Sequence, residues 1–151
     1  MDLFFDSPLY IAYAFLFGII IGSFLNVLVY RFHTGKSLGG SSHCLSCNAA
    51  LTWYELVPLL SYVALRGRCR TCGSYIPPRY FLVELSTGLG FAMVASLGDT
   101  LPLQIIGMGM WSILVAILVY DLYHTIIPDE FSLALFLVAA VKMGYEAYLL
   151  Y

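Results

Sequence analysis

Charged residues are scarce in this chain of 151 residues: they make up only 11% of it, against 61% hydrophobic residues. A soluble domain usually carries about 25% charged residues, so the composition excludes an ordinary soluble protein. The chain also lacks a basic N-terminal segment and a small-residue cleavage site after its first apolar run. We therefore expect no removable secretory signal and a protein that resides in a lipid bilayer.

Four apolar segments approach the length needed to cross about 30 Å of hydrocarbon as helices. They are residues 9–30, 80–97, 103–120 and 131–151. Four such segments in succession, with almost no charge inside them, make buried helices of a soluble core a poor explanation. The sequence predicts an all-α integral membrane protein with about four transmembrane helices, because helices satisfy their own backbone hydrogen bonds in lipid.

Basic residues are concentrated between the first and second spans, whereas the N-terminal flank carries only Asp2 and Asp6. Six of the seven Lys and Arg residues lie there: Arg31, Lys36, Arg66, Arg68, Arg70 and Arg79. Because basic loops remain in the cytoplasm, we expect this loop to be cytoplasmic and the N-terminus to lie outside. The chain then divides into an anchor helix (1–30), a cytoplasmic loop (31–79) and a three-helix part (80–151).

Cysteine is absent everywhere except in this loop, where Cys44 and Cys47 form one C-x-x-C pair and Cys69 and Cys72 form another. This spacing delivers four thiolates to one tetrahedral zinc ion and leaves no open position for catalysis. We predict a structural zinc site in a small zinc-ribbon-like insert. Two disulfides or a redox dithiol are the alternatives, which a reducing compartment and the lack of a βαβ pattern disfavour.

Polar and small residues interrupt the first two spans. Gly18 and Gly22 form a small-x-x-x-small pattern, and Asn26 continues the same face, which predicts a contact with another helix. An amide inside a span needs a partner, so Asn26 should face protein. Glu84 lies one turn past Arg79-Tyr80, where pairing with an arginine or reaching the membrane surface would explain it; a functional role stays open.

One carboxylate stands at the membrane boundary, because Asp121 directly follows the third span. A partly desolvated carboxyl group there is a candidate general acid or base. Asp129 precedes the fourth apolar run, where a carboxylate caps a helix start. His124 lies between them as a proton relay or, more simply, a surface histidine. Aspartic protease chemistry needs two carboxylates in different protonation states, so these residues alone do not establish it.

The order of these motifs resembles the type IV prepilin peptidases over about residues 22–129. Several independent motifs in the same order make the likeness specific. The residues that carry it are Gly22-Ser23-Phe24-Leu25-Asn26-Val27, Tyr30-Arg31, the two cysteine pairs, Glu55-Leu56-Val57-Pro58-Leu59-Leu60-Ser61-Tyr62, Gly67-Arg68-Cys69-Arg70-Thr71-Cys72-Gly73, Arg79-Tyr80, Glu84-Leu85, Thr87-Gly88, and Asp121 with Ile127-Pro128-Asp129.

Members of that family are polytopic inner-membrane aspartic endopeptidases. They remove the basic leader of prepilins and pseudopilins after a glycine at the cytoplasmic face, and many then methylate the new amino terminus with S-adenosylmethionine. The resemblance implies these substrates and activities for the full-length protein, the first catalytic aspartate at Asp121, and zinc on the four cysteines. Asp129 also matches a family position and is kept as a cap or supporting residue. No nucleic-acid partner is expected.

A second catalytic aspartate, which the family supplies in a later Gly-x-Gly-Asp motif, is missing. Gly144-Tyr145-Glu146 is not that motif, and Gly98-Asp99 precedes Asp121 in a turn expected on the opposite side of the membrane. We expect the chain to be an incomplete N-terminal portion, inactive alone. The alternative is a non-catalytic, membrane-embedded zinc-loop module of a pilus or type II secretion system. No glycine-rich cofactor fingerprint supports methyl transfer independently.

Overall fold

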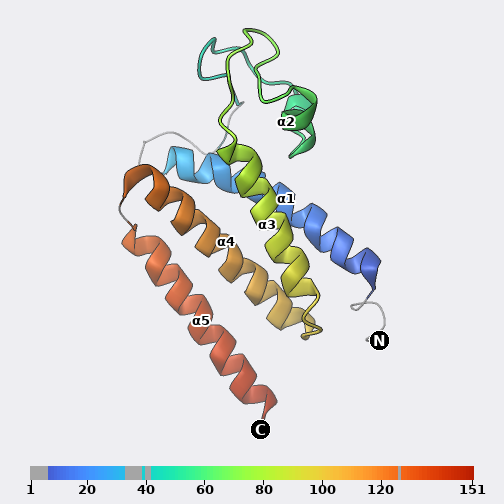
Figure 1. Cartoon of the computed structure of the whole chain (residues 1–151). Coiled ribbons are helices and arrows are strands. Elements are labelled where there is room, and N and C mark those ends of the chain that lie inside the picture. Colours follow the sequence, from blue (N-terminus) through green and yellow to red (C-terminus); the bar gives the residue numbers. More distant parts are fainter. Residues whose placement is uncertain (1–6, 33–38, 40–41, 126) are drawn as a thin grey trace.

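Helices dominate the computed structural model, which describes residues 7–32, 39, 42–125 and 127–151. The elements are α1 (Pro8–Arg31), the 3-10 helix η2 (Trp53–Leu56), α2 (Leu60–Ala64), α3 (Arg79–Ala95), α4 (Leu101–His124) and α5 (Asp129–Leu149). No β-strand occurs in these ranges, which confirms the all-α prediction. The long helices form a bundle, and the insert between α1 and α3 lies at one end of it (Figure 1).

Each of the four apolar segments forms a helix close to its predicted range. Three of them, α1, α4 and α5, are long and apolar enough to cross a membrane. The remaining long helix, α3, has 17 residues, fewer than the roughly 20 of a typical span, and it packs against both α1 and α4. Asp2, Asp6 and Lys36, which entered the orientation prediction, lie outside the described residues.

Local signals in the sequence set where the helices begin and end. Ser7 caps α1 by accepting a hydrogen bond from the Tyr10 amide at 3.2 Å, and Pro8 occupies the first helical position, where its missing N–H has no cost. The helix α4 ends at His124, and the left-handed φ of 51° at its C-cap, Thr125, terminates the hydrogen-bond ladder. These boundaries place Asp121 in the last turn of α4.

The predicted glycine face of α1 is its contact with α3. Ideal Cβ atoms built on Gly18 and Gly22 would each lie 2.8 Å from an α3 backbone atom, the Cα of Gly88 and of Glu84 respectively. Only a residue without a side chain permits this approach. The helix-contact prediction is therefore confirmed, and the partner is α3.

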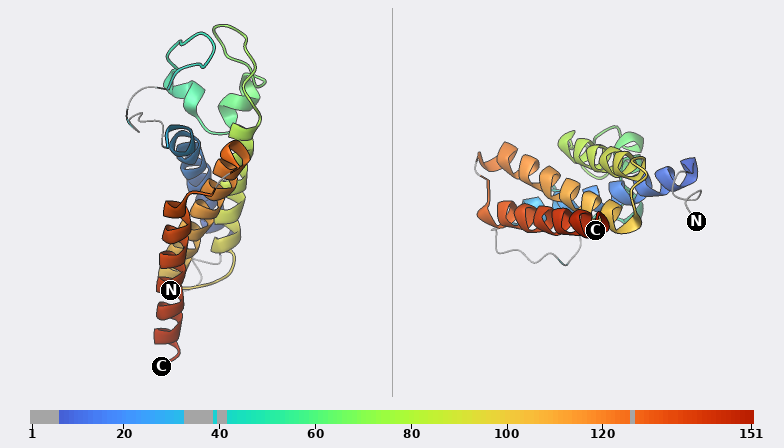
Figure 2. Two further views of the ribbon diagram at one scale, coloured as in Figure 1. Left: turned by 90° about the vertical axis from the view of Figure 1, so that its left-hand side faces the viewer. Right: turned by 90° about the horizontal axis from the view of Figure 1, so that it is seen from below.

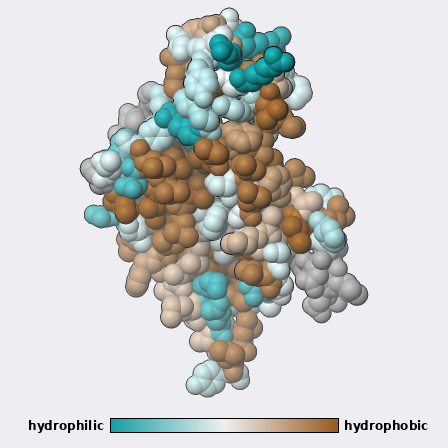
Figure 3. All heavy atoms as spheres, viewed as in Figure 1, coloured by the Kyte–Doolittle hydropathy of each residue, from teal (hydrophilic) through white to brown (hydrophobic). Residues whose placement is uncertain are grey.

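The bundle core lies between α1, α3 and α4. Phe91 is almost fully buried in it, and the Trp111 indole donates a hydrogen bond across the α3–α4 interface to the Ser86 carbonyl at 3.1 Å. By contrast, α5 packs on α4 and buries none of its described residues. Apolar side chains cover much of the bundle in the face shown in Figure 3, as a lipid-facing surface requires.

The two ends of the bundle differ in character. The insert stands over one end, whereas the end of α5 lies at the other (Figure 2). At the end remote from the insert, the buried Gln104 side chain donates to the Asp99 carbonyl at 2.9 Å and accepts a hydrogen bond from Tyr10. Because Asp99 and Asp121 lie at opposite ends of α4, roughly 33 Å of helix separates them.

The glycine contact predicts opposite effects for one substitution at two helical sites. Gly22→Ala should lower the free energy of unfolding by about 1–3 kcal/mol, because the added methyl collides with the α3 backbone. Gly144→Ala should raise it by up to about 1 kcal/mol, because open space surrounds this glycine and alanine favours helix. Denaturant titration in detergent micelles measures both, and equal shifts would contradict the packing described here.

Candidate metal centre and adjoining cavity

The first cysteine pair sits in a tight turn closed by an isolated antiparallel bridge between His43 and Ala50. Inside it, the Cys44 amide donates to the Ala49 carbonyl and the Asn48 amide donates to the Cys44 carbonyl, both at 2.9 Å. Asn48 adopts a left-handed φ of 57°, a conformation that asparagine tolerates better than most residues. The turn therefore presents both cysteines on one short loop.

The second cysteine pair repeats this geometry. A bridge joins Arg68 and Tyr75, the Cys69 amide donates to the Ser74 carbonyl at 2.8 Å, and the Gly73 amide donates to the Cys69 carbonyl at 2.9 Å. Gly73 has a φ of 70° at the position that Asn48 holds in the first turn. Two equivalent turns thus supply two cysteines each, the arrangement expected of a zinc ribbon.

The four sulfur atoms converge on one point. All four Sγ atoms lie within 4.8 Å of one another, and the Sγ atoms of Cys44 and Cys72 are 3.9 Å apart. A tetrahedral zinc site with Zn–S bonds of about 2.3 Å places its sulfurs about 3.8 Å apart, so the cluster fits such an ion. All four thiols are free, which agrees with a shared metal better than with two disulfides.

Backbone amides prepare this cluster for a cation. Hydrogen bonds from the amides of Cys47 and Ser46 are the main causes that lower the pKa of Cys44 to about 6. For Cys47, the Ala49 amide lowers the pKa, but desolvation and the neighbouring sulfurs outweigh it and raise the pKa to about 11. The thiolate therefore forms readily at Cys44 and less readily at Cys47, and a positive ion among the sulfurs would favour deprotonation of both.

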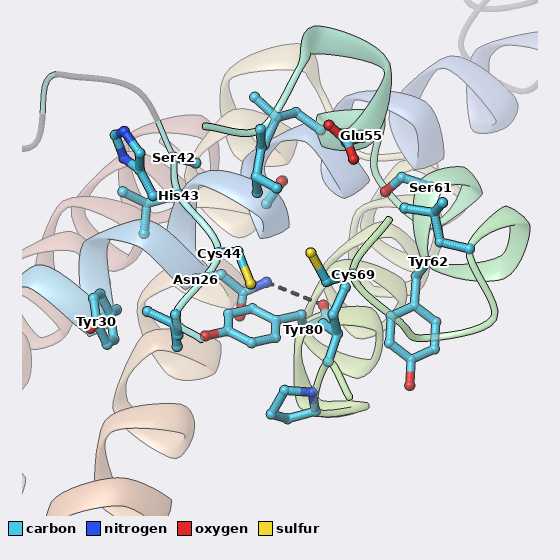
Figure 4. Close-up of a pocket in the computed structure, with 18 of the residues that line it drawn as sticks. Asn26, Tyr30, Ser42, His43, Cys44, Glu55, Ser61, Tyr62, Cys69 and Tyr80 are labelled. Atoms are coloured by element: carbon cyan, nitrogen blue, oxygen red, sulfur yellow. Dashed lines mark hydrogen bonds between the residues drawn. The ribbon is translucent and has the colours of Figure 1, made fainter. Parts of the chain in front are cut away.

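A cavity of about 660 Å³ lies between the four-cysteine cluster and the adjacent ends of α1 and α3 (Figure 4). Cys44 and Cys69 form part of its wall on the insert side. Residues of α1 and α3 form the opposite wall: Ser23, Asn26, Val27, Tyr30, Arg31, Tyr80, Phe81 and Glu84. No sequence pattern pointed to this cavity, because it exists only once the insert rests on the helix ends.

Two membrane-helix side chains hold that wall in place. The Asn26 side chain donates to the Tyr80 carbonyl at 3.1 Å, which confirms that it faces protein. Glu84 is 9% exposed, and its Oε2 accepts a hydrogen bond from the Leu59 amide at 2.8 Å. Leu59 has a φ of 59°, an unfavourable conformation for a leucine. Glu84 thus holds the insert through a backbone amide. From the sequence, we expected it instead to pair with an arginine or to reach the membrane surface.

Asp121 lies apart from this cavity, and the residues that line the cavity do not include it. It is partly exposed in the last turn of α4, beside a group of rings in which those of Tyr120 and His124 are 4.3 Å apart. Asp129 is the first residue of α5, but Pro128 is the N-cap and makes no side-chain capping bond. The predicted cap role of Asp129 is therefore reduced to a favourable charge in the first helical turn.

The fold and the four-sulfur insert define an α-helical membrane protein whose first two long helices flank a loop with four cysteines that could hold a metal ion. Residues 16–97, which span this unit, match the model of the bacterial peptidase A24 N-terminal domain. The chain therefore belongs to the prepilin peptidase family, of which it represents the N-terminal portion.

Named relatives support this assignment. A prepilin leader peptidase/N-methyltransferase of Myxococcus xanthus is 44% identical over 124 residues, which cover 81% of this chain and 37% of the relative. An enzyme of the same name from Burkholderia pseudomallei is 32% identical over a match that covers 83% of this chain and 49% of the relative. A type 4 prepilin-like proteins leader peptide-processing enzyme of Escherichia coli is 35% identical over a match that covers 76% of this chain and 50% of the relative.

The chain thus spans half or less of the length of these three relatives. No solved structure matches it.

The cluster predicts zinc binding that depends on pH. The purified chain should hold one zinc ion, and Cys69→Ser should weaken zinc binding by more than about 100-fold, because loss of a ligand exceeds the usual effect of losing an outer partner. Zinc affinity should fall as the pH is lowered, because protons compete with the ion for the four sulfur atoms. Zinc content measured by mass spectrometry after dialysis between pH 8 and pH 5 checks this.

The exposed Thr71, which lies between two ligands, offers a control. Thr71→Ala should keep full zinc content, since it removes no sulfur. A metal-free protein whose thiols cycle through disulfides at a defined potential would overturn the zinc assignment in favour of the redox alternative.

Proposed function

We propose that this chain is the N-terminal portion of an inner-membrane leader peptidase and N-methyltransferase that acts on prepilins or pseudopilins. The observation that carries the proposal is the coincidence of the family match with the four-sulfur insert and its two flanking helices. The proposed activity is that of the named relatives, whose similarity extends beyond the matched domain to about four fifths of the chain.

The zinc ion has a structural role in this proposal. Four sulfur ligands fill its tetrahedral shell, so it stabilises the insert and does not activate water. The described part of the insert contains only short helices and isolated bridges, and a metal supplies the stabilisation that so small a core does not. The basic residues around it favour the cytoplasmic side for the insert, with the N-terminus outside.

Asp121 is proposed as the first of two catalytic carboxylates. Its support is the likeness of Asp121 and the following Pro128-Asp129 to the family motif, together with its place at the end of a membrane-length helix. In such a pair, one ionised carboxylate activates water while the protonated partner stabilises the oxyanion. Asp99 is too distant to be the partner, so we infer that these 151 residues do not cleave a leader by themselves.

A non-catalytic module is the second candidate. The missing Gly-x-Gly-Asp motif favours it, because a zinc-stabilised insert on membrane helices could recruit components of a pilus or secretion machine without any chemistry. The two candidates differ in whether residues encoded downstream restore peptide cleavage.

A leader-cleavage assay separates them. This chain and a version extended through its native downstream coding sequence are incubated in detergent with a prepilin peptide that carries a glycine at the cleavage site. Only the extended protein should release the leader, as followed by mass spectrometry. Asp121→Asn in the extended protein should lower kcat by about 10²–10⁴-fold, the usual contribution of a general acid or base.

Asp99→Asn is the matched control, because Asp99 carries the same side chain at the opposite end of α4 and should leave cleavage unchanged. Cleavage by the 151-residue chain that Asp121→Asn abolishes would show that the second acid lies within it. Absence of cleavage by both proteins would favour the non-catalytic module.

A further inference from the structure

Large apolar side chains stand exposed on the two short helices of the insert. Trp53 on η2 is 78% exposed, and Leu60 and Val63 on α2 are 69% and 63% exposed. Residues three apart lie on one side of a helix, so Leu60 and Val63 share a face of α2. We call these three side chains the outer face of the insert. Exposed apolar surface of this kind usually marks contact with a partner or a membrane.

The opposite side of these short helices faces the protein. The ring centre of Tyr62 on α2 lies 5.4 Å from that of Phe81 on α3. Glu55 on η2 lines the cavity and accepts hydrogen bonds from the amide and the hydroxyl of Thr52. Both short helices are therefore amphipathic, with ring and carboxylate contacts on the inside and the outer face directed away from the cavity.

The outer face continues into the exposed surface of α1. A groove beside η2 is lined in part by Ile20 and Phe24 of α1 and by Leu56 and Pro58 of the insert. Ile20 and Phe24 are exposed on a helix long and apolar enough to cross a membrane. In a 3-10 helix, residues three apart eclipse one another, so Leu56 and Trp53 share one side of η2. One apolar surface thus runs from α1 onto the insert.

Contacts with the long helices hold η2 and α2 close to the bundle. The groove reaches Ile20, which lies roughly 16 Å along the α1 axis from the helix end at Arg31. The Leu59 amide, at the start of α2, donates to Glu84 roughly 8 Å into α3. The two cysteine loops, in contrast, stand farther from the bundle (Figure 2). The outer face therefore lies near the level at which α1 and α3 enter the hydrocarbon.

Basic side chains follow the outer face. Arg66 and Arg68 are exposed directly after the end of α2. Basic groups beside membrane helices are attracted to anionic headgroups, and tryptophan prefers the headgroup level of a bilayer. Apolar side chains with a tryptophan and a basic flank are typical of a helix that lies in a membrane surface. This combination favours lipid over a protein as the occupant of the outer face.

We propose that η2 and α2 form an interfacial element that docks on anionic phospholipid in the leaflet beside the insert. The outer face enters the boundary between headgroups and acyl chains, and Arg66 and Arg68 contact the lipid phosphates. The bilayer then supports the cavity wall, because Glu55 and Tyr62 stand on the inner side of the same helices. The proposal depends on no catalytic activity of the chain.

Fluorescence quenching in nanodiscs of anionic phospholipid tests the depth of Trp53. The chain has two tryptophans, so the Trp53 signal is the difference between the unmodified chain and Trp53→Phe. Lipid brominated near the headgroup end of its acyl chains should quench this signal at least about threefold more than acrylamide in the water does. Quenching by acrylamide alone would place η2 in water, and resistance to both quenchers would place a second copy over the outer face; either result overturns the proposal.

A charge placed on the outer face should lift it from the lipid. Leu60→Glu should lower the quenching of the Trp53 signal by brominated lipid about twofold or more, because a carboxylate is costly below the headgroups. Leu45→Glu is the matched control, since Leu45 is 65% exposed on the first cysteine turn, away from the bundle. Zinc content equal to that of the unmodified chain shows that each variant retains its insert. Equal quenching in the two variants would contradict docking.

Arg66→Gln tests the charge of the lipid without changing the apolar contact. It should lower the quenching of the Trp53 signal in anionic nanodiscs and leave it unchanged in phosphatidylcholine nanodiscs, because only anionic headgroups attract the guanidinium. An equal response in the two lipids would overturn the assignment of anionic phospholipid. Failure of the leader-cleavage assay would contradict the proposed peptidase and leave these results standing.

Discussion

The close approach of α1 and α3 at Gly18 and Gly22 is the contact on which the remaining architecture depends. The insert leaves the bundle at the end of α1 and returns at the start of α3, so their packing fixes the two ends of the insert side by side. That spacing lets the insert fold back over the helix ends and brings Glu84 within reach of Leu59. A bulkier residue at Gly22 would alter both the packing of α1 against α3 and the position of the insert.

Charge in this protein is concentrated where the chain leaves the apolar bundle. The cysteine turns bring four sulfur atoms together, the cavity wall holds two carboxylates, and Asp121 lies in the last turn of α4. These groups occupy two separate places, because Asp121 does not line the cavity.

Much of this could be predicted from the sequence, because the relevant signals are local. Apolar segment length predicted all four long helices, and cysteine spacing predicted the cluster. The glycine face and Asn26 also matched, since helical periodicity fixes which residues share a side. The Glu84–Leu59 bond and the cavity could not be predicted: they join segments distant in sequence and depend on a left-handed leucine that no residue pattern signals. The roles of Asp121 and the chain's orientation remain predictions.

The internal repetition of the two cysteine turns has a consequence for how the insert folds. Each turn is closed by its own backbone hydrogen bonds, so each brings a pair of sulfurs together as a preformed half-site. An ion that joins the halves cross-links two points of the chain, as a disulfide does. By the chain-entropy relation, closing a loop of this size costs about 3–4 kcal/mol, which binding of the ion to the folded insert would offset. Metal supply would then set how much of the insert is folded in the cell.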